Sequence, residues 1–292
     1  MIAQIFAATA PMLLITGLGY FWDKRGLPFD NAMVSYLATN VGTPCLLVSV
    51  LMVRHPDPHL MLRMLAAGTC VVVGGGVLGF AVLRARGLSA RVYLPALMFP
   101  NTGNMGIPLS LFAFGDAGLA AAVAFFATVA LFQFSLGPSI TTGNFSLRQS
   151  LSTPVVWAMP LVLALLGLGI ALPVWVANTV NVLAGMTIPL MILSLGTSLA
   201  RLRVTGAARL AGLALVRLVI GFAIGVGVVH LFGLTGAARG AVLIQSSMPA
   251  AVFNYLFALR YGARPEDVAA IVIISTLISF LTLPLLLAFV LG

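Results

Sequence analysis

The chain has 292 residues, of which 61% are hydrophobic and only 7% are charged. Soluble domains carry about 25% charged residues, so this composition excludes an ordinary soluble fold and indicates a protein embedded in lipid. The formal charge of +9 comes from basic residues scattered between apolar runs, without the basic stripe or interleaved aromatic residues typical of a nucleic-acid interface. We therefore expect membrane lipid, and not nucleic acid, as a partner.

The cysteines and histidines form no pattern typical of a cofactor or metal site. Cys45 and Cys70 lie inside apolar segments and make no CxxC pair, which argues against a disulfide framework. His55 and His59 are four residues apart, but two prolines interrupt any helix there, so a wet loop is the simpler interpretation. We predict no metal, no cofactor and no catalytic residue, which is to say that the protein is not an enzyme.

Ten apolar segments are each long enough to span a bilayer, which takes about 20 residues of helix. The first has no basic leader, so we expect it to remain as a spanning helix rather than to be cleaved as a signal. The first half contains the expected spans 2–22, 31–53, 64–83, 92–114 and 117–141. The second half contains 153–172, 174–199, 210–232, 240–259 and 268–291.

The two halves resemble each other at an offset of about 146 residues. Segment 42–49 aligns with segment 187–194, which places Pro44 on Pro189. The third and eighth spans each carry two glycines four residues apart, a spacing that allows close approach of helices. Because five spans is an odd number, the second half must insert upside down. We therefore predict two inverted five-helix repeats, residues 1–145 and 146–292, within one membrane-embedded unit.

The basic residues of the loops divide unequally between the two sides of the membrane. The richer side receives Lys24, Arg25, Arg84, Arg86, Arg91, Arg148, Arg201, Arg203, Arg209, Arg260 and Arg264, and the poorer side receives Arg54, Arg63 and Arg239. The positive-inside rule makes the richer side cytoplasmic. We expect an integral protein of the plasma (bacterial inner) membrane with both termini outside.

Two spans contain sequence that a continuous helix would not favour. Segment 99–108 reads FPNTGNMGIP and segment 245–254 reads QSSMPAAVFN, each in the middle of its span. Proline removes a backbone donor, and non-helical backbone at membrane depth survives only where protein or a wet cavity satisfies it. Broken helices at matching repeat positions indicate a transporter's substrate site, whereas simple proline kinks are the alternative.

The candidate residues follow from these two segments. The candidate substrate-binding residues are Asn101, Thr102, Gly103, Asn104, Gly106, Pro108, Gln245, Ser246, Ser247, Pro249 and Asn254. The candidate helix-break residues are Pro44, Pro100, Pro108, Pro189 and Pro249.

The chemistry of such a site would favour an anion. Half-helices starting near Asn104 and Pro249 would each direct an N-terminus, with about half a positive charge, at the midplane. All acidic residues lie in loops or at span ends, so the mid-membrane carboxylate that a cation antiporter needs is missing. These two features argue for a neutral or anionic substrate.

Arg217 is the one basic residue inside a span, roughly 10 Å beyond the cytoplasmic Arg209 at 1.5 Å per residue. Its side chain can reach back to the interface or bond to backbone carbonyls. It can also serve as the counter-charge for a carboxylate substrate, and so we include Arg217 among the candidate substrate-binding residues.

The string PNTGNMGIPL, residues 100–109, resembles the hallmark of the auxin efflux carrier family, which includes bacterial carriers of malonate and other organic acids. Residues 246–262 and 275–287 resemble the ninth and tenth helices of that family. The resemblance implies a ten-helix, sodium/proton-antiporter-like crossover fold with scaffold and transport subdomains. It also implies transport of carboxylates at residues 101–108 and 247–254. Family members often carry an acidic residue at the position of Leu259.

The sequence thus predicts a secondary transporter that moves small organic anions, auxin- or malonate-like, by alternating access. A drug/metabolite-type carrier of a neutral solute has similar length and duplication but relies on unbroken helices. A membrane enzyme would need a catalytic group in a span, and a channel would need a ring of charges or a filter-like loop. Whether two copies form a homodimer is left open.

Overall fold

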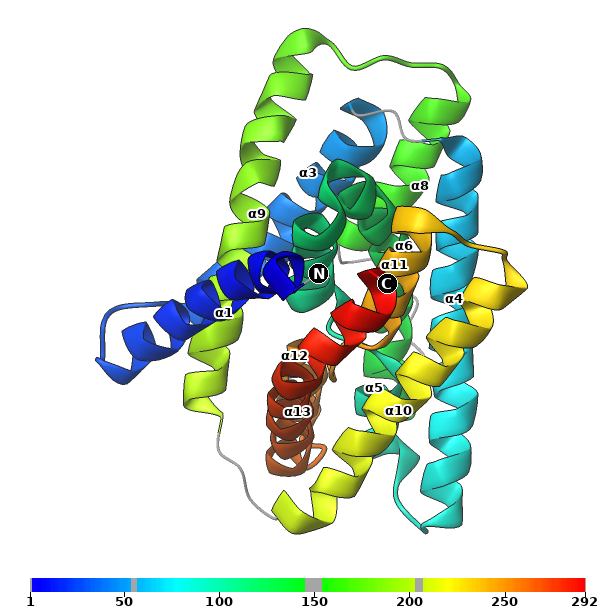
Figure 1. Ribbon diagram of the computed structural model, residues 1–292. Coiled ribbons are helices and arrows are strands. Elements are labelled where there is room, and N and C mark those ends of the chain that lie inside the picture. Colours follow the sequence, from blue (N-terminus) through cyan, green and yellow to red (C-terminus); the bar gives the residue numbers. More distant parts are fainter. Residues whose placement is uncertain (1, 54–56, 145–153, 203–206, 292) are drawn as a thin grey trace.

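A computed structural model describes residues 2–53, 57–144, 154–202 and 207–291 (Figure 1). Within these ranges every regular element is a helix, and the only extended pairing is one isolated β-bridge, so the prediction of an all-helical fold is confirmed. Seven of the described helices are long and apolar enough to cross a membrane. Arg54, His55, Pro56, Arg148 and Arg203 lie outside the described residues.

The helices follow the apolar runs of the sequence closely. The first half forms α1 (Ile2–Lys24), α2 (Asn31–Leu37), α3 (Thr43–Val48), α4 (Pro58–Ala85), α5 (Ala90–Met98) and α6 (Ile107–Thr142). The second half forms α8 (Pro154–Gly167), α9 (Val174–Arg201), α10 (Ala207–Leu231), α11 (Gly236–Ser246), α12 (Val252–Tyr261) and α13 (Pro265–Leu291). Three wider π-helical segments, Ala38–Gly42, Ser49–Val53 and Thr102–Gly106, join or precede these helices.

The long helix α6 is interrupted at Gly115, whose φ of 61° and ψ of −147° are not helical. A Cβ on Gly118 would overlap the carbonyl oxygen of Ser110. Residues eight apart in a straight helix lie about 12 Å from each other, so this contact requires the chain to reverse at Gly115. The reversal coincides with the expected boundary between spans 92–114 and 117–141.

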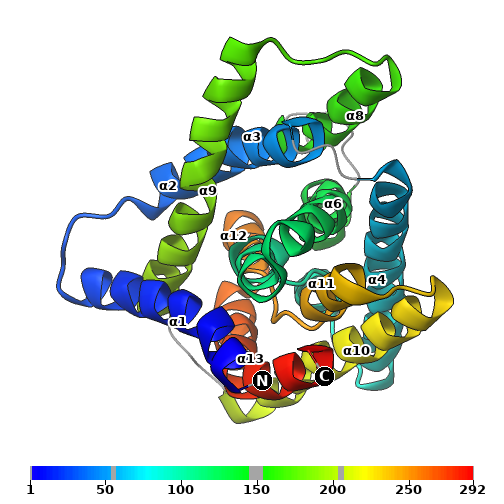
Figure 2. The same ribbon diagram turned by 45° about the horizontal axis from the view of Figure 1, so that its top comes forward.

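The outer helices surround a central group. In Figure 2, α6, α11 and α12 lie in the middle, with α2, α3, α8 and α9 above them, α1 to the left, α4 to the right, and α10 and α13 below. The α1–α9 crossing is close because Gly19 faces the Leu193 carbonyl and Gly196 faces the Thr16 carbonyl. A side chain at either glycine would separate the two backbones.

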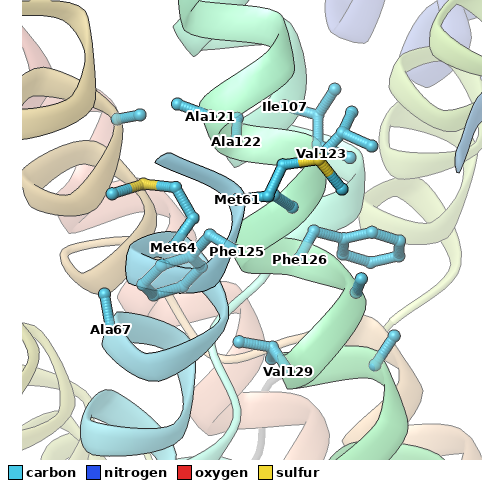
Figure 3. Close-up of a cluster of buried hydrophobic side chains, with 14 of the residues drawn as sticks. Met61, Met64, Ala67, Ile107, Ala121, Ala122, Val123, Phe125, Phe126 and Val129 are labelled. Carbon is cyan, nitrogen blue, oxygen red and sulfur yellow. The ribbon is translucent and has the colours of Figure 1, made fainter. Parts of the chain in front are cut away.

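A large apolar cluster joins α4 to α6. Met61, Met64 and Ala67 of α4 meet Phe125 and Val129 of α6, and all five side chains are at most 4% exposed (Figure 3). Burying a side chain of this kind contributes about 1.5–3 kcal/mol in water, but lipid is nearly as apolar as the core. Close packing therefore has to hold these helices together.

The glycine pairs at matching positions of the two halves pack in the same way. Gly75 of α4 lies against the end of α5, where a Cβ would be 3.4 Å from the Met98 carbonyl oxygen. Gly221 of α10 lies against the end of α11, where a Cβ would overlap the Ser246 carbonyl. Each glycine thus lets a long helix approach the end of a short one.

Two substitutions on α10 test this close approach. Gly221→Ala should lower the melting temperature, because overpacking a tight contact typically costs about 1–3 kcal/mol. Gly227→Ala is the matched control, since a Cβ there meets nothing within 4 Å, and it should leave stability unchanged or slightly raised. Equal melting temperatures for the two purified variants would contradict the packing described here.

Candidate functional site

The two interrupted spans meet at their breaks. Between α5 and the π-helical segment Thr102–Gly106, and between α11 and α12, the backbone leaves the helical conformation. There Pro100 and Ala250 form an antiparallel β-bridge. The Asn101 amide donates to the Pro249 carbonyl at 2.7 Å, and the Ala251 amide donates to the Phe99 carbonyl at 3.1 Å. Each break therefore satisfies the backbone groups of the other, as membrane depth requires.

The non-helical backbone covers residues 99–101 and 247–251, whereas the segments expected from the sequence are 101–108 and 247–254. The half-helices begin at Thr102 and Val252 rather than near Asn104 and Pro249. Pro108 lies where α6 continues from the π-helical segment Thr102–Gly106, so it does not mark a break. Pro44 likewise lies where α3 continues from the π-helical segment Ala38–Gly42, and Pro189 lies inside α9. Of the five candidate break residues, the non-helical backbone thus contains Pro100 and Pro249.

Arg217 of α10 binds the carbonyl ends of both short helices. Its Nη1 donates to Leu97 at 2.8 Å, and its Nη2 donates to Ser246 at 2.8 Å. The Met248 carbonyl accepts from Nε and Nη2, each at 3.3 Å. The side chain is 0% exposed and lines neither cavity described below. Bonding to backbone carbonyls, one of the two expected roles, is the arrangement observed.

A small pocket lies beside the bridge, on the side of the helix N-termini. Its volume of about 20 Å³ suits a single water-sized group. The lining residues are Thr39, Thr43, Pro100, Asn101, Thr102, Gly103, Asn104, Phe126, Gln133, Phe134, Met191, Ala251 and Phe253. Asn101 is 4% exposed, and its Nδ2 has no hydrogen-bond partner. The pocket therefore presents an unused donor at the start of a helix.

The small pocket adjoins a much larger cavity, which we call the vestibule. It has a volume of about 700 Å³ and shares Thr39, Asn104, Phe134 and Phe253 with the pocket. One wall is mostly polar and carries Asn31, Ser35, Asn40, Ser194, Ser198 and Arg201. The opposite wall is mostly aromatic and carries Phe134, Phe253, Tyr255, Phe257 and Tyr261. A ligand in the vestibule would therefore meet hydrogen-bonding groups on one side and rings on the other.

Aromatic side chains separate the vestibule from the pocket. The rings of Phe134 and Phe253 meet edge to face with centroids 5.0 Å apart, and Phe257 lies 6.0 Å from Phe134 in a similar geometry. Such pairs contribute about 0.5–1.5 kcal/mol beyond the area they bury. Phe134 and Phe253 line both cavities, so their rings lie at the boundary between them.

The vestibule opens toward the basic side of the protein. Arg201 pairs with Asp23 at 2.6 Å, and the Asp30 carboxylate accepts hydrogen bonds from the amides of Ala32 and Met33. The Arg260 guanidinium lies over the Tyr261 ring at 5.8 Å. Arg260 thus contributes a positive charge that no carboxylate of the described chain pairs with.

The candidate residues of the second half are buried behind the pocket. Gln245 donates to the Ala122 carbonyl, and Ser246 donates to the Leu243 carbonyl. Asn254 accepts from Gln133 and donates to the Phe99 carbonyl, which fixes the bridge in place. Ser247 lines a separate, largely apolar cavity of about 400 Å³ between α10 and α13.

Four of the candidate substrate-binding residues of the first half lie at the pocket. Asn101, Thr102, Gly103 and Asn104 line the pocket, whereas Gly106 packs against Gln245 and leaves no room for a side chain. Sequence reasoning missed the lining residues of other spans. Gln133 could have been selected as a candidate from the sequence, because its polar amide lies within the apolar segment 117–141.

Comparison with known proteins points to transport. A family model described as a membrane transport protein matches residues 138–287. An uncharacterized transporter of Methanothermobacter thermautotrophicus is 26% identical over 293 residues, covering 94% of either chain. An uncharacterized transporter of Methanocaldococcus jannaschii is 26% identical over 202 residues, covering 64% of either chain. The matched region of the family model includes α9 to α12 and most of α13.

Asn254 provides a test of the bridge. Asn254→Leu leaves the buried Gln133 amide without its acceptor and leaves the Phe99 carbonyl with the Ala251 amide alone, which should cost about 1–3 kcal/mol and lower the melting temperature. Asn40→Leu is a control, because that amide donates only to the Tyr36 carbonyl of its own helix. If both variants melt together with the wild type, the Asn254 bonds do not stabilise the crossing.

Proposed function

The chain belongs to the membrane transport protein family, and on this premise we propose that it is a secondary transporter of small organic anions. The family is that of the auxin efflux carriers, so the resemblance drawn from the sequence is confirmed. Residues 246–262 lie within the matched region, and the string at 100–109 lies outside it. Membership supports movement of a solute across a membrane rather than catalysis.

We further propose ten membrane spans in two inverted repeats, residues 1–145 and 146–292. The short helices support this arrangement, because α5 with the first part of α6, and α11 with α12, each add up to one interrupted span. The reversal at Gly115 separates the fourth span from the fifth. The similar packing of Gly75 and Gly221 adds a structural correspondence between the halves.

The proposed orientation places the vestibule on the cytoplasmic side of a bacterial inner membrane, with both termini outside. Arg201 and Arg260 line the vestibule, and both belong to the basic set of loop residues. The positive-inside rule assigns that set to the cytoplasm. In alternating access, this arrangement corresponds to a state in which the site is reached from within.

The observation that carries the proposed substrate class is the unpaired Nδ2 of Asn101. This donor is buried beside the start of one half-helix and close to the Pro249–Ala251 segment that precedes the other. Helix N-termini favour negative charge, and charge-assisted hydrogen bonds are stronger than neutral ones. We propose that a carboxylate oxygen occupies the pocket while the rest of the substrate lies in the vestibule.

The competing functions find less support. A drug/metabolite-type carrier of a neutral solute has continuous helices, whereas the backbone here leaves the helix at Phe99–Asn101. A membrane enzyme would need a nucleophile or a general base at the site, and the residues lining the pocket include no His, Cys, Asp or Glu. A neutral solute with a carbonyl group remains the second candidate substrate.

A transport assay tests the proposed function directly. Proteoliposomes containing the purified protein should take up at least one radiolabelled mono- or dicarboxylate, with and without imposed proton and sodium gradients. Sugars and amines serve as the comparison set. Uptake of an amine together with none of any carboxylate would refute the proposed substrate class.

Asn101→Ala and Asn104→Ala should each weaken transport while leaving expression near normal. A lost hydrogen bond to substrate costs about 1–3 kcal/mol, which corresponds to very roughly five- to a hundredfold in affinity. Asn178→Ala is the matched control, because this exposed asparagine of α9 lines neither the pocket nor the vestibule. Wild-type transport by both pocket variants would place the site elsewhere.

The proposed topology predicts which side of the membrane each loop faces. In a background with Cys45 and Cys70 replaced by serine, Arg86→Cys should react with an impermeant thiol reagent only from the cytoplasmic side. Thr235→Cys should react only from outside, and both positions are exposed. Labelling of both from the same side would contradict the inverted arrangement.

A further inference from the structure

Arg217 is the only charged side chain among the buried residues that the structure describes. It has no salt bridge to a carboxylate in the described chain, and its hydrogen-bond partners there are all backbone carbonyl oxygens. Burying an unpaired charge is costly. The carbonyls that surround Arg217 must therefore supply the compensating negative charge.

Those carbonyls are the negative ends of two helices. Leu97 lies in the last turn of α5, Ser246 is the last residue of α11, and Met248 lies two residues beyond it. Each helix C-terminus carries about half a negative charge, so the two ends together amount to about one. The guanidinium of Arg217, which is always charged, thus balances both ends with a single group.

Gly221 leaves space for the guanidinium group of Arg217. A Cβ on Gly221 would lie 3.0 Å from Nη2 of Arg217, so glycine leaves space between α10 and the end of α11. The corresponding position of the first half, about 146 residues earlier, is Val71, which carries no charge. One arginine on one half therefore serves the broken helices of both halves.

Among the described residues, the N-terminal ends of the half-helices that begin at the crossing have no side chain that balances their positive partial charge. The helix that starts at Thr102 and the helix α12 each retain about half a positive charge at the N-terminus. No acidic side chain is among the residues that line the small pocket there. With the negative ends cancelled by Arg217, the crossing as a whole is left with about one net positive charge on the pocket side.

We infer that Arg217 is a positioning residue that sets the anion selectivity of the pocket without touching the substrate. It does so by neutralising the negative C-terminal ends of α5 and α11 on the far side of the crossing. This inference rests on the proposed function, because it explains how a pocket without a basic side chain could prefer an anion. The side chain is 0% exposed and its donors are already engaged, so it is not a direct counter-charge. Without Arg217, the negative and positive ends would nearly cancel, and the preference would fall.

The test compares charged and neutral ligands of similar shape. Affinities of malonate and indole-3-acetate are measured against those of malonamide and indole-3-acetamide, by calorimetry on the wild type, Arg217→Lys and Arg217→Gln. Removing a unit charge about 10 Å from an anion, at an effective dielectric constant of about 20, weakens binding on the order of tenfold. Arg217→Gln should lose about this factor for the carboxylates and little for the amides, whereas Arg217→Lys should keep most of the preference.

Arg239→Gln is the matched control. Arg239 also donates to carbonyls near the end of a helix, those of Phe289 and Val290 in α13, but it lies away from the crossing. Its loss should leave the carboxylate-to-amide ratio unchanged. If Arg217→Gln also keeps the wild-type ratio, the inference is refuted. If the wild type itself shows no preference for carboxylates, the proposed function fails instead.

A second comparison decides the question if Arg217→Gln does not fold. With Arg217 in place, the pocket should accept a fixed negative charge, so Asn101→Asp should melt at least as high as Asn101→Leu at neutral pH. A buried charge without compensation would be far more destabilising than leucine. A much lower melting temperature for Asn101→Asp would show that the pocket is not positive and would overturn the inference.

Discussion

Every other feature of the site depends on how two interrupted helices pair their backbone N–H and C=O groups in the water-free interior of a membrane. A polar backbone group left unpaired in hydrocarbon costs several kcal/mol, so neither break could persist alone. The reciprocal bonds between Phe99–Asn101 and Pro249–Ala251 resolve this constraint on one side of the crossing. On the other side Arg217 takes up the carbonyls that the helix ends leave free. The close packing of α4 on the end of α5 and of α10 on the end of α11, which Gly75 and Gly221 allow, then holds the two short helices in place.

The two halves contribute differently to the site, although their sequences are related. In the first half the wide π-helical segment Thr102–Gly106 turns Asn101, Thr102 and Asn104 toward the pocket. In the second half α12 begins as an ordinary α-helix, and Asn254 is used to secure the bridge instead of lining the cavity. The first half thus presents polar groups to the pocket, and the second half supports them.

Much of the helix pattern could be predicted from the sequence, because apolar runs and their interruptions are set by the lipid environment. The break at Pro100 and Pro249 followed from the loss of backbone donors at mid-span. The exact residues at which each helix is interrupted could not be predicted in the same way. Glycine and asparagine at 103–106 suggested an open segment, but Gly106 packs on Gln245 and the turn stays helical. Pro189 shows the same limit, since tertiary packing keeps α9 continuous through it.

Lining residues from distant spans, such as Thr39 and Met191, could not be predicted, because only the folded chain brings them to the crossing. The vestibule was missed for the same reason, although its aromatic residues are clustered in the sequence of α12.

The hydrogen bonds of the β-bridge join main-chain atoms only. These bonds of the crossing therefore do not depend on which side chains line the pocket. The Asn101 amide and the Pro249 carbonyl would still meet if the side chains at 101, 102 and 104 were exchanged. Under the proposed function, substitutions in the pocket could therefore change the ligand one residue at a time while the crossing stays intact. Diversity of transported compounds among related proteins would then arise without any change of architecture.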